Sequence, residues 1–143
     1  MNVATILKLK GRTVATARPE STLMDIATKL NAKKIGAVVV VGDNGHVDGI
    51  VSERDVIRAI AESGAGALQR PVSEFMTANV VSCHESSALD ELMELMTQGR
   101  FRHLPVMEDG SLVGIVSIGD VVKNHVAEVE MEASSMRSYL ATG

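Results

Sequence analysis

The sequence predicts a protein of mixed α/β class, built from two copies of one β-α-β-β-α unit and a C-terminal helix. Three observations predict this fold. The heptapeptide GIVSERD at residues 49–55 returns as GIVSIGD at residues 114–120, with glycine, serine and aspartate in register. Each copy follows two short apolar runs around a Gly-containing turn, as in a β-hairpin. Each hairpin in turn follows a stretch whose apolar residues have helical spacing, so the whole chain repeats one supersecondary unit.

The first unit is predicted element by element. A β-prone run at residues 13–16 predicts a strand, and a Ser/Thr-rich stretch then caps a helix. The buried face of that helix consists of Leu23, Ile26, Ala27 and Leu30. Residues 37–41 and 47–52 predict the two strands of a hairpin, because the Asn44-Gly45 pair favours the positive φ angles of a type I′ turn. A helix over residues 55–62 closes the unit.

The second unit repeats this order. A strand is expected at residues 80–82, and the helix that follows has its own apolar face. That face consists of Leu89, Leu92, Met93 and Met96. Residues 104–107 and 112–117 predict a hairpin around Asp109-Gly110, and a helix begins at Asp120. These elements place the units at residues 8–62 and 76–128. A Gly-rich linker at residues 63–75 joins them, and a helical extension follows at 129–143.

The last helix carries an apolar seam with alternating spacings of four and three residues. The seam consists of Val122, Val126, Val129, Ala133, Met136 and Leu140. Such spacing is typical of a coiled-coil contact, although fewer than three heptads is short for one. Two interpretations therefore stay open: the seam packs along its own unit, or it forms a dimer contact.

Composition narrows the class of protein. Hydrophobic residues make up 45% of the chain and charged residues 22%, as in an ordinary soluble domain. A net charge of −4, without a basic run, argues against nucleic-acid binding. No secretory signal and no apolar run of about 20 residues is present, so we expect a cytoplasmic protein without a membrane span. Cys83 and His84 form a lone pair without further spaced ligands, which favours a structural role over a metal site.

The repeated junction has two interpretations. Ser52 with Asp55, and Ser117 with Asp120, have the spacing of a helix capping box. Capping does not explain the glycine that opens each heptapeptide, because a glycine within a strand often marks close approach of another group. A helix N-terminus attracts anions, and a neighbouring carboxylate can accept hydrogen bonds from a ribose. A nucleotide site is therefore the second interpretation.

The chain resembles a pair of cystathionine β-synthase (CBS) domains. The resemblance covers residues 8–128 and rests on the repeated GIVSxxD, on the Arg102-His103-Leu104-Pro105-Val106 run and on the doubled element order. In that family two units pack through their sheets with pseudo-two-fold symmetry. The clefts between them commonly bind adenosine-containing ligands, and two pairs often form a dimer.

The resemblance implies a set of binding residues. Asp55 and Asp120 would hold ribose hydroxyls, with Ser52 and Ser117 beside them on ribose or phosphate. Residues expected near phosphate are Arg102, His103 and Arg54. Residues expected near adenine are Thr77, Ile118 and Val80. Because Arg102, His103 and Ile118 belong to the second unit, the second cleft is expected to bind more tightly.

The functional hypothesis is a sensor that binds an adenine nucleotide and acts on a separate protein partner or on its own dimer geometry. AMP is the expected ligand, with ATP, ADP, NAD and S-adenosylmethionine as alternatives, and no cofactor is required. The competing hypothesis is an interaction protein without a ligand that dimerises through its C-terminal helix. Catalysis is not expected, because the sequence shows no nucleophile–base set and no spaced metal ligands.

Overall fold

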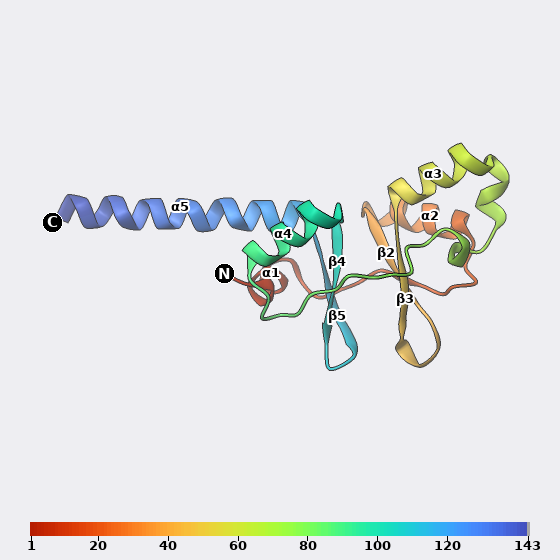
Figure 1. Cartoon of the computed structure of the whole chain (residues 1–143), viewed down its shortest axis with the longest axis horizontal. Helices are drawn as coiled ribbons and strands as arrows, with labels where there is room; N and C mark the ends of the chain where they lie inside the picture. Colours follow the sequence, from red (N-terminus) through yellow and green to blue (C-terminus); the bar gives the residue numbers. More distant parts are fainter. Residues whose placement is uncertain (143) are drawn as a thin grey trace.

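The computed structural model describes residues 1–142 and shows a mixed α/β fold (Figure 1). The helices are α1 (Val3–Lys10), α2 (Leu23–Lys33), α3 (Glu53–Ser63), α4 (Leu89–Gly99) and α5 (Ile118–Thr142). The strands are β1 (Thr16–Ala17), β2 (Ala37–Val41), β3 (Val47–Ser52), β4 (His103–Glu108) and β5 (Ser111–Ser117). Short 3-10 helices are η1 (Asp43–Gly45), η2 (Ala65–Gln69) and η3 (Val72–Glu74). Within residues 1–142, no helix combines the length and hydropathy needed to cross a membrane.

The first unit contains the complete β-α-β-β-α order. β1 runs parallel to β2, and β2 runs antiparallel to β3. The hairpin strands occupy the predicted residues, whereas β1 lies at Thr16–Ala17 and not at residues 13–16. The strand begins later because residues 11–15 carry the chain across from α1, where Arg12 pairs with Glu85 of the second unit (Figure 1).

The second unit lacks the predicted strand at residues 80–82. Only Cys83 pairs there, through an isolated parallel bridge to Val106 of β4. In the first unit the N–H of Val39 donates to the Ala15 carbonyl at 3.0 Å. Pro105 takes the place of Val39 in β4 and has no N–H to donate, so the equivalent rung of the ladder is missing. The second sheet is therefore the two-stranded hairpin β4-β5.

Both hairpin turns contain the positive φ angles that the sequence predicts, but their lengths differ. Asp109 and Gly110, with φ of 49° and 78°, form a two-residue connection between β4 and β5. The first connection is longer and includes η1, with Asn44 at φ 61° and Gly45 at φ 74°. Both ladders contain a register shift at equivalent positions, between Val40 and Val41 and between Val106 and Met107.

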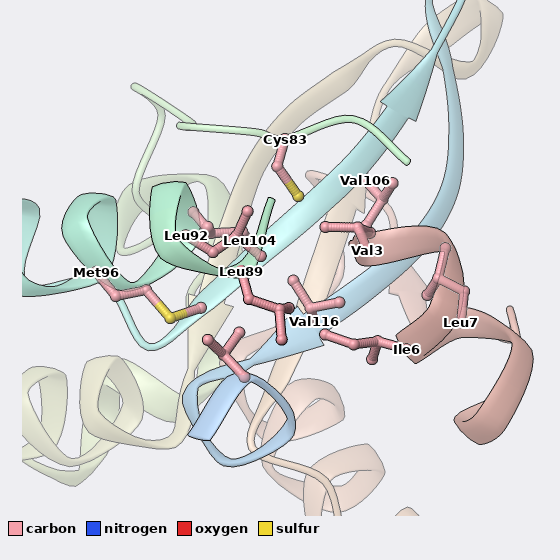
Figure 2. Packing of buried hydrophobic residues seen from close by; sticks show 11 residues of the cluster. Val3, Ile6, Leu7, Cys83, Leu89, Leu92, Met96, Leu104, Val106 and Val116 are labelled. Carbon is pink, nitrogen blue, oxygen red and sulfur yellow. The ribbon is translucent and has the colours of Figure 1, made fainter. Parts of the chain in front are cut away.

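Each unit has its own hydrophobic core, and each core is completed by a segment that precedes the other unit in the chain. The first core includes Leu23, Ile26, Val38, Val40, Val51 and, from η3, Val72. The second includes Leu89, Leu92, Leu104, Val106, Val116 and, from α1, Val3, Ile6 and Leu7 (Figure 2). We call α1 and residues 72–77 the exchanged segments. The contribution of α1 to the second core is not predicted by the repeat pattern.

The exchanged segments dock in equivalent ways. The N–H of Val72 donates to the Ser21 carbonyl at 2.7 Å, and the N–H of Val3 donates to the Ser87 carbonyl at 3.0 Å. Each acceptor lies just before the first helix of the unit that receives the segment, α2 or α4. The two units are therefore tied together by a reciprocal exchange within one chain.

The exchange explains the glycine that opens each repeated heptapeptide. A Cβ on Gly49 would lie 2.6 Å from the Met76 sulfur and 2.9 Å from the Thr77 carbonyl oxygen. A Cβ on Gly114 would lie 2.7 Å from a Leu7 methyl group. The close approach that each glycine indicates is therefore made by an exchanged segment of the same chain.

The seam on α5 does not pack along its own unit. Among residues 118–141 of α5, Val121 and Asn124 are buried against the unit. Val122, Val126 and Val129 are 46%, 49% and 48% exposed, and the helix then projects away from the rest of the molecule (Figure 1). The predicted extension is helical through residue 142, and residue 143 lies outside the described residues.

Adding a methyl group at either repeated glycine is expected to destabilise the fold. Gly49→Ala should cost about 1–3 kcal/mol, as overpacked cores do, because a backbone carbonyl as well as Met76 must move. Gly114→Ala should cost less, since only the flexible end of Leu7 must shift. Urea denaturation measures both free energies of unfolding. Gly66→Ala is the control, because its Cβ meets nothing within 4 Å; an equal cost at all three positions would contradict the exchange as the cause.

Candidate functional site

Both repeated junctions form capping boxes, as the first interpretation of the sequence expects. Asp55 Oδ2 accepts the backbone N–H of Ser52 at 2.8 Å, and the Ser52 hydroxyl accepts that of Asp55 at 3.4 Å. At the second junction the corresponding distances, between Ser117 and Asp120, are 2.9 and 3.2 Å. Capping fixes each carboxylate at the start of its helix, α3 or α5. The two junctions then differ in what surrounds them.

A cavity of about 500 Å³ opens at the first junction. Its volume is within the usual range of small-molecule sites, roughly 300–1,000 Å³. From the first unit it is lined by Gly36, Ala37, Ile50, Ser52, Glu53, Arg54, Asp55 and Arg58. From the linker and the second unit it is lined by Thr77, Gly99, Arg100, Phe101, Arg102, His103 and Ile118. Both units therefore contribute to one cavity.

The basic pair of the second unit lies at the first junction. Arg102 and His103 line the cavity that contains Ser52 and Asp55, because the start of β4 faces the β3–α3 turn. A Cβ on Gly36 would lie 3.0 Å from His103 Nε2, which shows how closely the two units approach there. Tighter binding in the second cleft was expected because of Arg102, His103 and Ile118. All three residues instead line the cavity of the first junction.

Charge within the cavity is mainly positive. Four arginines, Arg54, Arg58, Arg100 and Arg102, line the cavity, against two acidic residues, Glu53 and Asp55. Arg58 pairs with Asp55 from the next turn of α3. Burial lowers the pKa of His103, with the nearby Glu53 carboxylate acting in the opposite direction. The His103 ring is therefore neutral at neutral pH and can donate one hydrogen bond.

The residues expected near adenine separate into two groups. Thr77 and Ile118 line the cavity, together with Ile50, whereas Val80 is not among its lining residues. The N–H and carbonyl of Thr77 bond to the carbonyl and N–H of Ile50, at 2.9 and 3.0 Å. The Thr77 carbonyl keeps a second lone pair for a ligand, while its N–H is already used.

The second junction is occupied by a lysine from α1. Lys10 Nζ lies 2.6 Å from Asp120 Oδ2 and 3.0 Å from the Ile115 carbonyl oxygen. Burial acts to raise the pKa of Asp120, but the hydrogen bonds from Lys10 and Ser117 outweigh it, and the net pKa is lowered. Ser117 and Asp120 are not among the residues that line the cavity of the first junction.

The two side chains of the Cys83–His84 pair have separate surroundings. Cys83 is buried in the second core, and burial raises the pKa of its thiol to about 12. His84 Nδ1 lies 2.8 Å from the Met107 carbonyl oxygen. Among the described residues, no group of three or more His, Cys, Asp or Glu side chains is placed to hold a metal ion.

A family model for the CBS domain matches residues 9–62 and 72–126. The chain belongs to the CBS-domain family. A solved CBS-domain protein from Agrobacterium tumefaciens is 53% identical, with a TM-score of 0.83 over 85% of this chain and 91% of its own. A CBS domain protein from Pyrobaculum aerophilum, complexed with AMP, is 26% identical, with a TM-score of 0.75 over 84% and 89%.

A third CBS structure carries two further ligands. The CBS domain pair of the protein MJ0100 was solved in complex with 5′-methylthioadenosine and S-adenosyl-L-methionine. It is 26% identical to this chain, with a TM-score of 0.79 over 90% of this chain and 98% of its own. The two matched ranges describe a pair of CBS domains in this chain, as in the MJ0100 structure.

Ile50, Arg58, Arg100 and Lys10 were not predicted from the sequence as site residues. The sequence does contain a signal for Arg58, because it lies three positions after Asp55 on one helix and so faces the same side as that carboxylate. Arg100 ends α4 in the left-handed conformation, with φ 58°, which directs the chain towards the cavity. Lys10 had no signal, because 110 positions separate it from Asp120.

Replacing Lys10 by Met is expected to raise the pKa of the Asp120 carboxyl. Without the ammonium group, the effect of burial is opposed only by the hydrogen bonds from Ser117. In the wild type the charged carboxylate stabilises the fold above its unfolded-state pKa of about 3.9 and loses this effect as pH falls through the lower folded value. In the variant the loss begins at higher pH. NMR titration of the Asp120 carboxyl carbon measures the shift of its pKa.

Lys8→Met, at an exposed position of α1, is the control and should leave the Asp120 pKa unchanged. An unchanged Asp120 pKa in Lys10→Met would contradict the pairing.

Proposed function

We propose that this CBS pair is a regulatory module that binds a phosphate-bearing adenine nucleotide in the cavity of the first junction. The observation that carries the proposal is the convergence of a capped carboxylate, a helix N-terminus and four arginines on one cavity. Complexes of related CBS proteins with AMP and with S-adenosyl-L-methionine support an adenosine ligand. AMP is the ligand that we propose first.

Each part of the nucleotide has a complementary part of the cavity. The ribose hydroxyls would donate to the Asp55 carboxylate, whose Oδ1 also accepts from Arg58, beside Ser52. The adenine would lie between the apolar side chains of Ile50 and Ile118, near the Thr77 carbonyl. The phosphate would face the arginines, which form charge-assisted hydrogen bonds with phosphate oxygens. A cationic ligand such as S-adenosylmethionine would meet like charge, so AMP, ADP and ATP should bind more tightly than it does.

Regulation follows from the shared lining of the cavity. A ligand that contacts Asp55 in the first unit and Arg102 in the second would favour the relative arrangement of units that satisfies both contacts. By differential affinity it would shift the population towards that arrangement. The change would then be transmitted to a separate protein partner or to a second copy of the chain. The proposal includes no catalytic step.

Calorimetric titration with AMP tests the proposal through two matched carboxylates. Asp55→Ala is expected to weaken AMP binding at least tenfold, because it removes the ribose acceptor. Asp25→Ala removes the same N3 carboxylate from an equivalent capping box on α2, outside the cavity. Both variants should lose about 1 kcal/mol of stability, but Asp25→Ala should keep its affinity. Equal affinities in all three proteins would contradict a nucleotide role for Asp55.

The seam on α5 favours a second proposal, that two copies of the chain dimerise through this helix. Seam residues Met136 and Leu140 are 61% and 69% exposed, more than the seam residues nearer the unit. A row of apolar side chains at heptad spacing matches a second copy of itself, and such a contact needs no ligand.

Changing the seam should dissociate the dimer. Val129→Glu places a charge in the centre of the seam and is expected to convert a dimer into a monomer in sedimentation velocity experiments. Ala127→Glu adds the same charge to an exposed position off the seam and should leave the dimer intact. A wild-type protein that sediments as a monomer at micromolar concentration would contradict this second proposal.

A further inference from the structure

Lys10 contacts the two acceptors that distinguish the second junction. Its ammonium group lies 2.6 Å from the Asp120 carboxylate and 3.0 Å from the Ile115 carbonyl. Asp120 occupies the position in GIVSIGD that Asp55 occupies in GIVSERD. A ribose that bound at the second junction as proposed for the first would need the carboxylate that Lys10 holds.

The first junction is different at both acceptors. The carbonyl of Ile50, equivalent to Ile115, accepts the backbone N–H of Thr77 at 2.9 Å. Asp55 Oδ1 pairs with Arg58, which belongs to the same helix and itself lines the cavity. Lys10 instead bonds to Asp120 Oδ2, the oxygen that also accepts the N–H of Ser117. The first junction therefore borders a cavity, whereas the second carboxylate is bonded to an ammonium group from another element.

The rest of α1 holds Lys10 in position. Val3, Ile6 and Leu7 are almost completely buried in the second core. Leu7 lies over Gly114, and the N–H of Gly11 closes the helix on the Leu7 carbonyl at 2.8 Å. The Lys10 side chain is itself about one-third exposed, so its four-carbon stem can swing away without unfolding α1. Lys10 therefore competes with a ligand for Asp120 and does not exclude one permanently.

We propose that Lys10 is an intramolecular competitor for the ribose position of the second junction, so that the chain binds one nucleotide and not two. The inference rests on the proposed nucleotide function and specifies its stoichiometry. It makes the two junctions unequal through a residue outside both repeated heptapeptides. Any movement that withdraws α1 from the second core would also free Asp120, which links the second site to the exchanged segment.

Calorimetric stoichiometry with AMP tests the competitor directly. The wild-type protein is expected to bind one AMP per chain. Lys10→Ala and Lys10→Met should bind a second AMP, with at least a tenfold gain in affinity at that site.

Lys10→Met retains most of the aliphatic stem and so controls for lost packing. Lys8→Ala removes a lysine charge from an exposed position of the same helix and should behave as the wild type. The double variant Lys10→Met/Asp120→Asn should return to one AMP, and circular dichroism confirms that each protein is folded.

Three results would overturn the inference. Two AMP per chain in the wild type would show that Lys10 does not compete. One AMP per chain in both Lys10 variants would show that the second junction is closed for another reason. A loss of affinity in these variants would make Lys10 a ligand of the phosphate. In all three cases the nucleotide function itself stands. The absence of AMP binding in every protein overturns that function, and the inference with it.

Discussion

The reciprocal exchange of segments between the two units is the contact on which the rest of the structure depends. Leu7 packs over Gly114, and Met76 packs over Gly49, so each hairpin is covered by the segment that leads into the other unit. Neither core is complete without the exchanged segment. The same contacts determine how the units face each other, because the chain must cross between them twice (Figure 1). The glycines of the repeated heptapeptides are needed for this packing.

The carboxylates of the two junctions perform the same local task in different surroundings. Asp55 and Asp120 each cap a helix by accepting the N–H of the serine three positions earlier. Capping uses Oδ2 of each carboxylate. Asp55 lines a cavity with arginines from both units, and its Oδ1 pairs with one of them, Arg58. At Asp120 a lysine of an exchanged segment bonds to the capping oxygen Oδ2. One motif therefore supports two different environments, and the difference comes from tertiary structure.

The sequence predicted the parts of the fold that depend on local pattern. The strands at residues 37–41 and 47–52 were predicted with their observed bounds, because alternation of apolar runs and a turn signal define both ends. The prediction of a strand at residues 80–82 was wrong. The sequence contains a signal against it, because Pro105 removes a hydrogen-bond donor from the neighbouring strand. The role of α1 in the second core could not be predicted, because no repeat of the heptapeptide marks it.

The composition of the site was predicted better than its grouping. Ser52, Asp55, Arg54, Thr77, Arg102, His103 and Ile118 all line one cavity. From sequence alone these residues are expected in two clefts, because neighbours in the chain are expected to share one. In the folded chain the start of β4 faces the end of β3, and so the basic pair of one unit serves the junction of the other. Which residues face each other depends on the packing of the two units, and that packing has no local sequence signal.

Chemical-shift mapping with AMP tests most directly whether one cavity, shared by both units, is the ligand site. Amide resonances of the labelled protein are followed by two-dimensional NMR as AMP is added. If the cavity is the ligand site, large shifts are expected at Ser52 to Asp55 and at Arg102 and His103, saturating together, with small shifts at Ser117 to Asp120. Large shifts at Ser117 to Asp120, with residues 52–55 unchanged, would contradict a ligand site in this cavity.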